Sequence, residues 1–99
     1  MATYIATLHL TKKGVQGIHD TCERAAAFKA EAKKMGVKVT EVYWTLGPFD
    51  GVIVFSAPDD ETATAAMLQV SSHGNVQTST CRAFASSEMK KIVDKLPSN

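Results

Sequence analysis

The sequence predicts an α+β fold of the ferredoxin-like type, with a four-stranded antiparallel sheet, helices on one face and an appended C-terminal helix. Residues 3–10 alternate in polarity with the two-residue period of a β-strand. Two β-branched runs flank a Gly-Pro break in the middle of the chain, as the strands of a hairpin do. A stretch with helical spacing lies on each side of this hairpin, and a further strand follows the second of these helices. The resulting order, βαββαβ, is that of the split βαβ arrangement.

The first strand and the first helix have distinct faces. The two faces of the strand consist of Tyr4, Ala6, Leu8 and Leu10, and of Ile5, Thr7 and His9. A helix is predicted from Asp20 or Thr21 to Met35, because apolar residues recur there at spacings of three and four. Gly36 follows at the position where a left-handed residue ends many helices.

The central hairpin joins strands predicted over Val37–Leu46 and Gly51–Ala57. Both runs are rich in β-branched and aromatic residues. Gly47-Pro48 and Asp50-Gly51 are both turn signals, so the position of the turn stays open.

The second half of the chain predicts a helix, a strand and a last helix. The helix follows Pro58 with three carboxylates in its first turn and ends at His73-Gly74-Asn75. A fourth strand over Val76–Ala85 precedes a final helix that runs from Ser86-Ser87 to Pro97. One face of this strand consists of Val76, Thr78, Thr80, Arg82 and Phe84. The other face is made of small residues, and we expect it to pack against a helix.

The predicted topology leaves one face of the sheet uncovered. Right-handed crossovers place both helices on the same side. The open face would carry Ile5 and Val76, with Trp44 as a further candidate. Monomers seldom expose such an apolar patch, so we expect a second copy to cover it and a pocket to form between the two.

Composition sets the broad class of the protein. The 99 residues are 44% hydrophobic and 21% charged, which fits one globular domain over residues 1–99. A formal charge of +1 lacks the basic excess of nucleic-acid binders. No signal peptide or membrane-spanning apolar run is visible, so a cytoplasmic location is expected. Cys22 and Cys81 are therefore expected to be reduced and buried.

Several segments resemble the GYD family, which is named for a Gly-Tyr-Asp motif. The similarity spans roughly residues 4–84 and is carried by Tyr43–Val52, Ala57–Glu61 and Gly74–Thr80, with Gly14-Val15 and Arg24 upstream. Phe49 stands where the tyrosine of the name would be, so a role for a phenolic hydroxyl is not expected there. The resemblance implies the dimeric α/β-barrel architecture and no established reaction.

Two residues are candidates for proton transfer. Asp50 lies at the mouth of the hairpin, where a carboxylate could bind a polar ligand or act as a general base. An aspartate before glycine also fixes turns by accepting backbone hydrogen bonds, and this alternative is favoured. His9 would point into the inter-sheet space if its face is the open one, or lie at the solvent edge.

Candidate binding residues come from three places in the sequence. Arg82 among threonines could hold a carboxylate or phosphate, or pair with an acid of a second copy. Aromatic residues of the hairpin could stack on a flat ligand. The predicted binding set is Thr7, Tyr43, Trp44, Phe49, Thr78, Thr80 and Arg82. His19 and Cys22 are too few to predict a metal, and nucleotide motifs are absent from the sequence, so no cofactor is expected.

These features favour a homo-oligomeric protein that binds a small molecule between its open sheet face and a partner subunit. One alternative is a cofactor-independent monooxygenase or isomerase that uses His9 or Asp50. A second alternative is a purely structural assembly module. The sequence leaves open the ligand, the oligomer size and the sheet faces of Tyr43 and Trp44.

Overall fold

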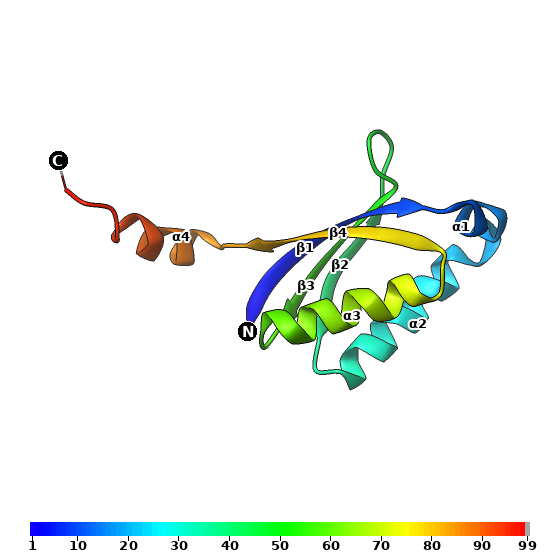
Figure 1. The fold of residues 1–99 in the computed structure, drawn as a ribbon, viewed down its shortest axis with the longest axis horizontal. Helices are drawn as coiled ribbons and strands as arrows, with labels where there is room; N and C mark the ends of the chain where they lie inside the picture. The colour runs from blue at the N-terminus through cyan, green and yellow to red at the C-terminus, as the bar shows by residue number, and fades with distance from the viewer. Residues whose placement is uncertain (99) are drawn as a thin grey trace.

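A computed structural model describes residues 1–98 and shows a sheet with helices beneath it and a C-terminal arm (Figure 1). The elements follow in the order β1 (Ala2–Leu10), α1 (Lys12–Gln16), the 3-10 helix η1 (Ile18–Asp20), α2 (Thr21–Lys34), β2 (Lys38–Trp44), β3 (Gly51–Ala57), α3 (Asp60–Ser72), β4 (Val76–Ala83) and α4 (Ser86–Val93). The predicted elements are all present. The short helices α1 and η1 occupy a segment for which the sequence predicted no regular structure.

The four strands form one antiparallel sheet in the order β2-β3-β1-β4. Helices α2 and α3 lie on the same side of it, and the other side is uncovered (Figure 1). The ferredoxin-like prediction is therefore confirmed.

Local hydrogen bonds set the helix ends. The carboxylate of Asp59 accepts the backbone N–H of Thr62 at 2.7 Å and caps α3. Hydrogen bonds from the side chain and then the backbone of Thr62 lower the pKa of Asp59. Helix α2 ends before Gly36, whose φ of +83° places it in the left-handed region.

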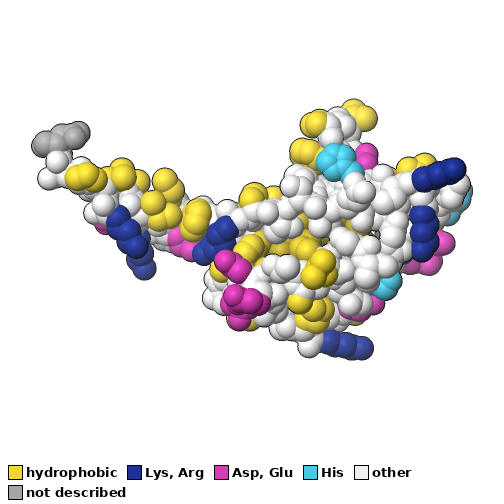
Figure 2. All heavy atoms as spheres, in the orientation of Figure 1, with side chains coloured by type: hydrophobic (Ala, Val, Ile, Leu, Met, Phe, Trp, Pro, Cys, Tyr) yellow, Lys and Arg dark blue, Asp and Glu magenta, His cyan; other side chains and the backbone are white. Residues whose placement is uncertain are grey.

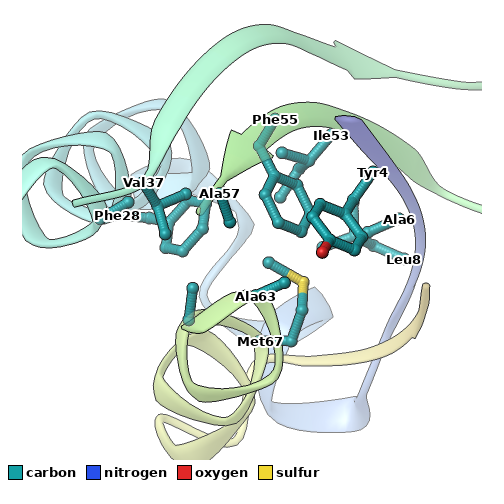
Figure 3. Close-up of a cluster of buried hydrophobic side chains, with 12 residues drawn as sticks. Tyr4, Ala6, Leu8, Phe28, Val37, Ile53, Phe55, Ala57, Ala63 and Met67 are labelled. Carbon is teal, nitrogen blue, oxygen red and sulfur yellow. The ribbon is translucent and has the colours of Figure 1, made fainter. Parts of the chain in front are cut away.

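The core fills the space between the sheet and the two long helices (Figure 3). Phe55 of β3 is fully buried, and its ring stacks on that of Tyr4 with centroids 5.3 Å apart. Met67 of α3 points toward this pair. Ala32 and Ala66 are fully buried, and their small side chains let α2 and α3 approach the sheet closely.

The register of β4 contradicts the predicted faces of this strand. Thr80 lies opposite Ala6, and Arg82 lies opposite Tyr4, so both face the helices together with Thr78. Val76 lies opposite Leu10 and packs against the core instead of on the open face. The small residues, such as Cys81 opposite Ile5, face the uncovered side. Strand β4 is weakly patterned, so its register is set by pairing with β1.

Trp44 also lies on the helix side, whereas Tyr43 lies on the uncovered side. Trp44 is paired with Gly51 and Tyr43 with Val52, and opposite residues of an antiparallel pair share a face. A bulge between Val39 and Glu41 shifts the alternation of β2 by one residue. The register therefore decides the face of Trp44, which the sequence left open.

Two further expectations need correction. Cys22 and Cys81 are both exposed rather than buried. Strand β4 ends at Ala83, and the chain then leaves the sheet as an arm that carries α4 (Figure 1). This arm accounts for the elongated shape of 55 × 31 × 18 Å.

Candidate functional site

A cleft of about 580 Å³ lies between the sheet and helices α2 and α3 at the hairpin end of the core. Its walls are mostly apolar, and the larger apolar side chains are Leu8, Leu10, Phe28, Val42, Ile53 and Val70. The core aromatic residues Tyr4 and Phe55 do not extend to this end, and Gly51 contributes no side chain. The volume is in the range of small-molecule sites.

Charged side chains at the border of the cleft hold neighbouring segments together. Arg24 of α2 donates through Nη1 to the carbonyl oxygen of Gly17 at 2.6 Å. Lys13 donates to the carbonyl oxygen of His73 at 2.7 Å and so links α1 to the end of α3. These bonds fix the border, and they place two cationic groups beside an apolar interior.

Asp50 also lines the cleft, and its carboxylate is already engaged. Its Oδ2 accepts the backbone N–H of Leu10 at 2.8 Å, and its own N–H donates to the carbonyl oxygen of Leu8 at 2.8 Å. Asp50 therefore binds the hairpin to the end of β1. The sequence favoured a structural role in which the Asp50 carboxylate accepts backbone hydrogen bonds, and the carboxylate does accept one. The N–H that it binds belongs to β1, however, and not to the turn.

His9 does not join Asp50 in the cleft. It is exposed at the end of β1, and its Nε2 lies 2.9 Å from the carbonyl oxygen of Pro48. The two predicted proton-transfer candidates thus contact the same loop without lining a common cavity.

Trp44 forms one wall of the cleft and is half exposed. Its indole Nε1 donates to the hydroxyl of Thr21 at 3.0 Å, which ties the end of β2 to the start of α2. Trp44 is the single tryptophan of the chain. It therefore reports directly on what enters the cleft.

Thr7 and Tyr43 belong to the uncovered face of the sheet, and Tyr43, on the edge strand β2, also borders the cleft. Thr7 Oγ1 donates to the carbonyl oxygen of Ser79 at 3.4 Å. Tyr43 donates to Glu41 at 3.0 Å, and this hydrogen bond raises the pKa of Tyr43. Phe49 is partly buried in the hairpin loop, and its carbonyl oxygen accepts the hydroxyl of Thr45.

Thr78, Thr80 and Arg82 border a second hollow of about 450 Å³ between β4 and α3. The guanidinium of Arg82 pairs with Glu88 of the same chain at 3.0 Å and lies over the ring of Phe84. The charge of Arg82 is therefore already compensated within the chain. The predicted binding set is divided among the cleft, this hollow and the uncovered face.

Tyr4 also borders this hollow. Its hydroxyl donates to Asp60 at 2.6 Å, and this hydrogen bond, followed by burial, raises the pKa of Tyr4. The phenol is thus held protonated and serves as a donor to α3.

Sequence reasoning missed Arg24 as a site residue. Arg24 lies four residues before Phe28, so both project from the same side of α2. The sequence signal for Arg24 was a cationic residue within the apolar stripe of a helix. The contribution of Lys13 had no comparable signal, because it depends on how α1 meets α3.

Comparison with known proteins places the chain in a family. The model of the GYD domain matches residues 4–93. The chain belongs to the GYD family. This agrees with the resemblance seen in the sequence.

The chain is 36% identical over 85 residues to the "Glutamine synthetase and cystathionine beta-lyase binding protein" of Thermus thermophilus. The alignment covers 85% of this chain and 90% of that relative. The crystal structure of TTHA0845, also from Thermus thermophilus, superposes with a TM-score of 0.57 at 24% identity, covering 87% of this chain and 96% of that one. The crystal structure of MtbAldR has a TM-score of 0.58 at 14% identity, covering 85% of this chain and 52% of that one. The structural similarities establish the fold.

Within residues 1–98, no helix combines the length and apolar character needed to cross a bilayer. The same residues bring together no group of three or more His, Cys, Asp or Glu side chains of the kind that holds a metal ion.

Proposed function

We propose that this GYD-domain protein binds a small, largely apolar molecule in the cleft between its sheet and helices α2 and α3. The observation that carries the proposal is the cleft itself, which is apolar inside and has charged groups at its border. A concave apolar site with a few polar groups is the usual form of a small-molecule site.

The lining indicates the chemistry of the ligand. Phe28 and Trp44 offer aromatic surface for a flat or branched apolar body. Arg24 and Lys13 line the cleft together with the carboxylates of Glu31 and Asp50, so the border carries both signs of charge and would favour a polar group. We therefore expect an apolar molecule with one polar end.

The positions and hydrogen bonds of the two proton-transfer candidates, Asp50 and His9, favour binding without catalysis. A general base must reach a substrate proton, but the Asp50 carboxylate is already bonded to the backbone of β1. His9 does not line the cleft. His9 and Asp50, the two residues on which the enzymatic alternative depends, are therefore not assembled around one cavity.

The test is a titration with the dye 1-anilinonaphthalene-8-sulfonate, which has an apolar aromatic body and one acidic group. We expect saturable binding, with quenching of Trp44 and energy transfer from Trp44 to the dye. Ala25→Phe should fill the cleft and weaken dye binding at least tenfold, because Ala25 lines it. Ala26→Phe is the matched control, since Ala26 is the exposed neighbour on α2.

Equal affinity in the two variants would place the dye elsewhere and contradict the proposal. Retained helical circular dichroism in both proteins would show that the fold is intact.

Self-association is the second part of the proposal. Ile5, Val52 and Val54 lie side by side on the uncovered face and are only partly buried. Their neighbours on this face include the uncharged Thr7, Ser56 and Ser79, and the edge strand β2 adds Lys38 opposite Ser56 and Glu41 opposite Val54. A surface with an apolar centre and one charge of each sign on its edge strand suits a second copy of itself.

Binding of other proteins is a second candidate function, favoured by the name of the relative that is 36% identical. Glutamine synthetase and cystathionine beta-lyase are the partners to test first. We expect one of the purified enzymes to bind in biolayer interferometry with micromolar or tighter affinity. If both enzymes bind only with a Kd on the order of 0.1 mM or weaker, this candidate is set aside.

A further inference from the structure

The C-terminal arm, residues 84–96, carries a row of apolar side chains that its own chain leaves open. Phe84, Met89, Val93 and Leu96 are between 48% and 66% exposed. Met89 and Val93 are four residues apart and share one side of α4, and Leu96 follows three residues after the helix ends. A partner that covers this row would stabilise α4, because an isolated helix of this length is marginal in water.

The arm is nevertheless held in a defined direction. Glu88 accepts the backbone N–H of Ala85 at 3.0 Å and pairs with Arg82 at 3.0 Å. Arg82 in turn donates to the carbonyl oxygen of Thr3 at 3.2 Å in β1. Strand β1 thus sets the direction of the arm through two side chains, and little conformational freedom is left to be lost on docking.

The apolar side of the arm faces the same way as the uncovered sheet. In Figure 1 helices α2 and α3 lie beneath the sheet and the arm extends from its end. In the same orientation, Figure 2 shows apolar atoms mainly along the upper side of the arm and lysines along its lower side. A body seated on the uncovered sheet face would therefore also meet the apolar row.

The area of the sheet face indicates why the arm is needed. Four strands about 4.8 Å apart and about 25 Å long offer a face of roughly 500 Å² in projection. Stable interfaces bury about 800 Å² of accessible surface on each partner, and only the central part of this face is apolar. The arm extends the apolar surface toward that requirement without enlarging the sheet.

We propose that the arm of each protomer clasps a second copy that is seated on its uncovered sheet face. The occupant is thus another copy of this chain, and the inference rests on the self-association proposed above. By two-fold symmetry each arm would contact its partner in the same way, so the interface would be closed.

The experiment is sedimentation equilibrium of the full chain in three variants. Met89→Glu with Val93→Glu disrupts the apolar row. Ser87→Glu with Lys91→Gln is the control, because it changes the net charge by the same amount on the opposite side of α4. Val54→Lys disrupts the centre of the sheet face.

We expect the arm variant to weaken association at least tenfold, the control to change it less than twofold, and Val54→Lys to abolish it. If Val54→Lys dissociates the dimer while the arm variant keeps the wild-type constant, the arm inference is wrong and sheet-face association stands. A wild-type protein that is monomeric at 100 µM would overturn both.

A photo-crosslinker at Met89 gives an independent readout. Crosslinks to the partner, on peptides of β1 or β3, would support the clasp. Crosslinks confined to the same chain would contradict it even if the protein is a dimer.

Discussion

At the scale of single residues, Asp50 connects two segments that are distant in sequence. Its carboxylate accepts the Leu10 N–H, while the backbone of Asp50 bonds to Leu8 and Thr45. One aspartate thus sets the position of the hairpin loop relative to β1. It also shapes the cleft that it lines.

Replacing Asp50 separates this structural role from a catalytic one. Asp50→Ala should lower the free energy of unfolding by about 1–2 kcal/mol, because the Leu10 N–H loses a charged acceptor. Asp50→Asn keeps an acceptor and should lose less. Urea denaturation measures both, and equal stability of all three proteins would remove the structural assignment.

Gly14 is a second position where one atom decides the packing. A Cβ at this position would lie 2.1 Å from the backbone oxygen of Asn75, so α1 and the start of β4 would have to separate. Gly14→Ala should therefore destabilise the protein by about 1–3 kcal/mol, the usual range for overpacking.

Gly17→Ala is the matched control for this substitution. There the added Cβ meets the side chain of Arg24 at 3.2 Å, and a side chain can shift. Thermal unfolding followed by circular dichroism compares the two. An equal loss of thermal stability in both variants would contradict the packing argument.

At the scale of elements, sequence periodicity located the helices and strands but not every face. The first strand was correctly divided because Tyr4, Leu8 and Leu10 share one of its sides, whereas the other side combines Ile5 with polar residues. In β2 the bulge between Val39 and Glu41 inverts the alternation, and nothing in the sequence marks it. In β4 both faces carry small or polar residues, so the hydrophobic pattern could not choose between them.

The candidate site was predictable only in part, for the same reason. Trp44 and Asp50 were singled out from residue type, and both line the cleft. The cleft itself depends on how far apart α2 and α3 lie over the sheet, which is a tertiary property. The prediction of a pocket on the open face followed from the topology alone and stays untested.

The arm should respond to acid through Glu88. The hydrogen bond from the Ala85 N–H, and then that from Arg82, lowers the pKa of Glu88. Because the folded pKa lies below the unfolded value of about 4.3, the stabilisation is complete above that pH. It is lost as the pH falls through the folded pKa.

We therefore expect amide hydrogen exchange of residues 86–93 to be less protected at pH 3 than at pH 6, after correction for intrinsic rates. Glu88→Gln should make the protection in this helix nearly independent of pH. Protection that is unchanged in the wild type would show that Glu88 does not hold the arm.

At the scale of the whole molecule, the two sides of the sheet have different tasks. The helix side contains the core and the cleft, whereas the other side presents an apolar strip between polar borders. The two native cysteines report on these sides separately, because Cys81 pairs with Ile5 on the uncovered face and Cys22 lies on α2.

Thiol labelling should distinguish a covered sheet face from a free one. We expect the labelling of Cys81 to slow as protein concentration rises and copies associate, while Cys22 reacts at a constant rate. Mass spectrometry of peptides labelled with a maleimide measures both rates in one sample. Val54→Lys should restore fast labelling of Cys81, and equal rates at every concentration would contradict sheet-face association.

The central position of β1 also has a consequence for how the chain folds. Thr3 pairs with Ala83 and Leu10 with Val76, so the middle of the sheet joins segments from nearly opposite ends of the chain. Closing such a long loop costs entropy before the stabilising contacts between the strands form. Folding is therefore expected to be slower than that of a helical bundle of equal size. Until β4 arrives, β1 exposes an unpaired edge, and an intermediate that lacks β4 is the species most prone to aggregate.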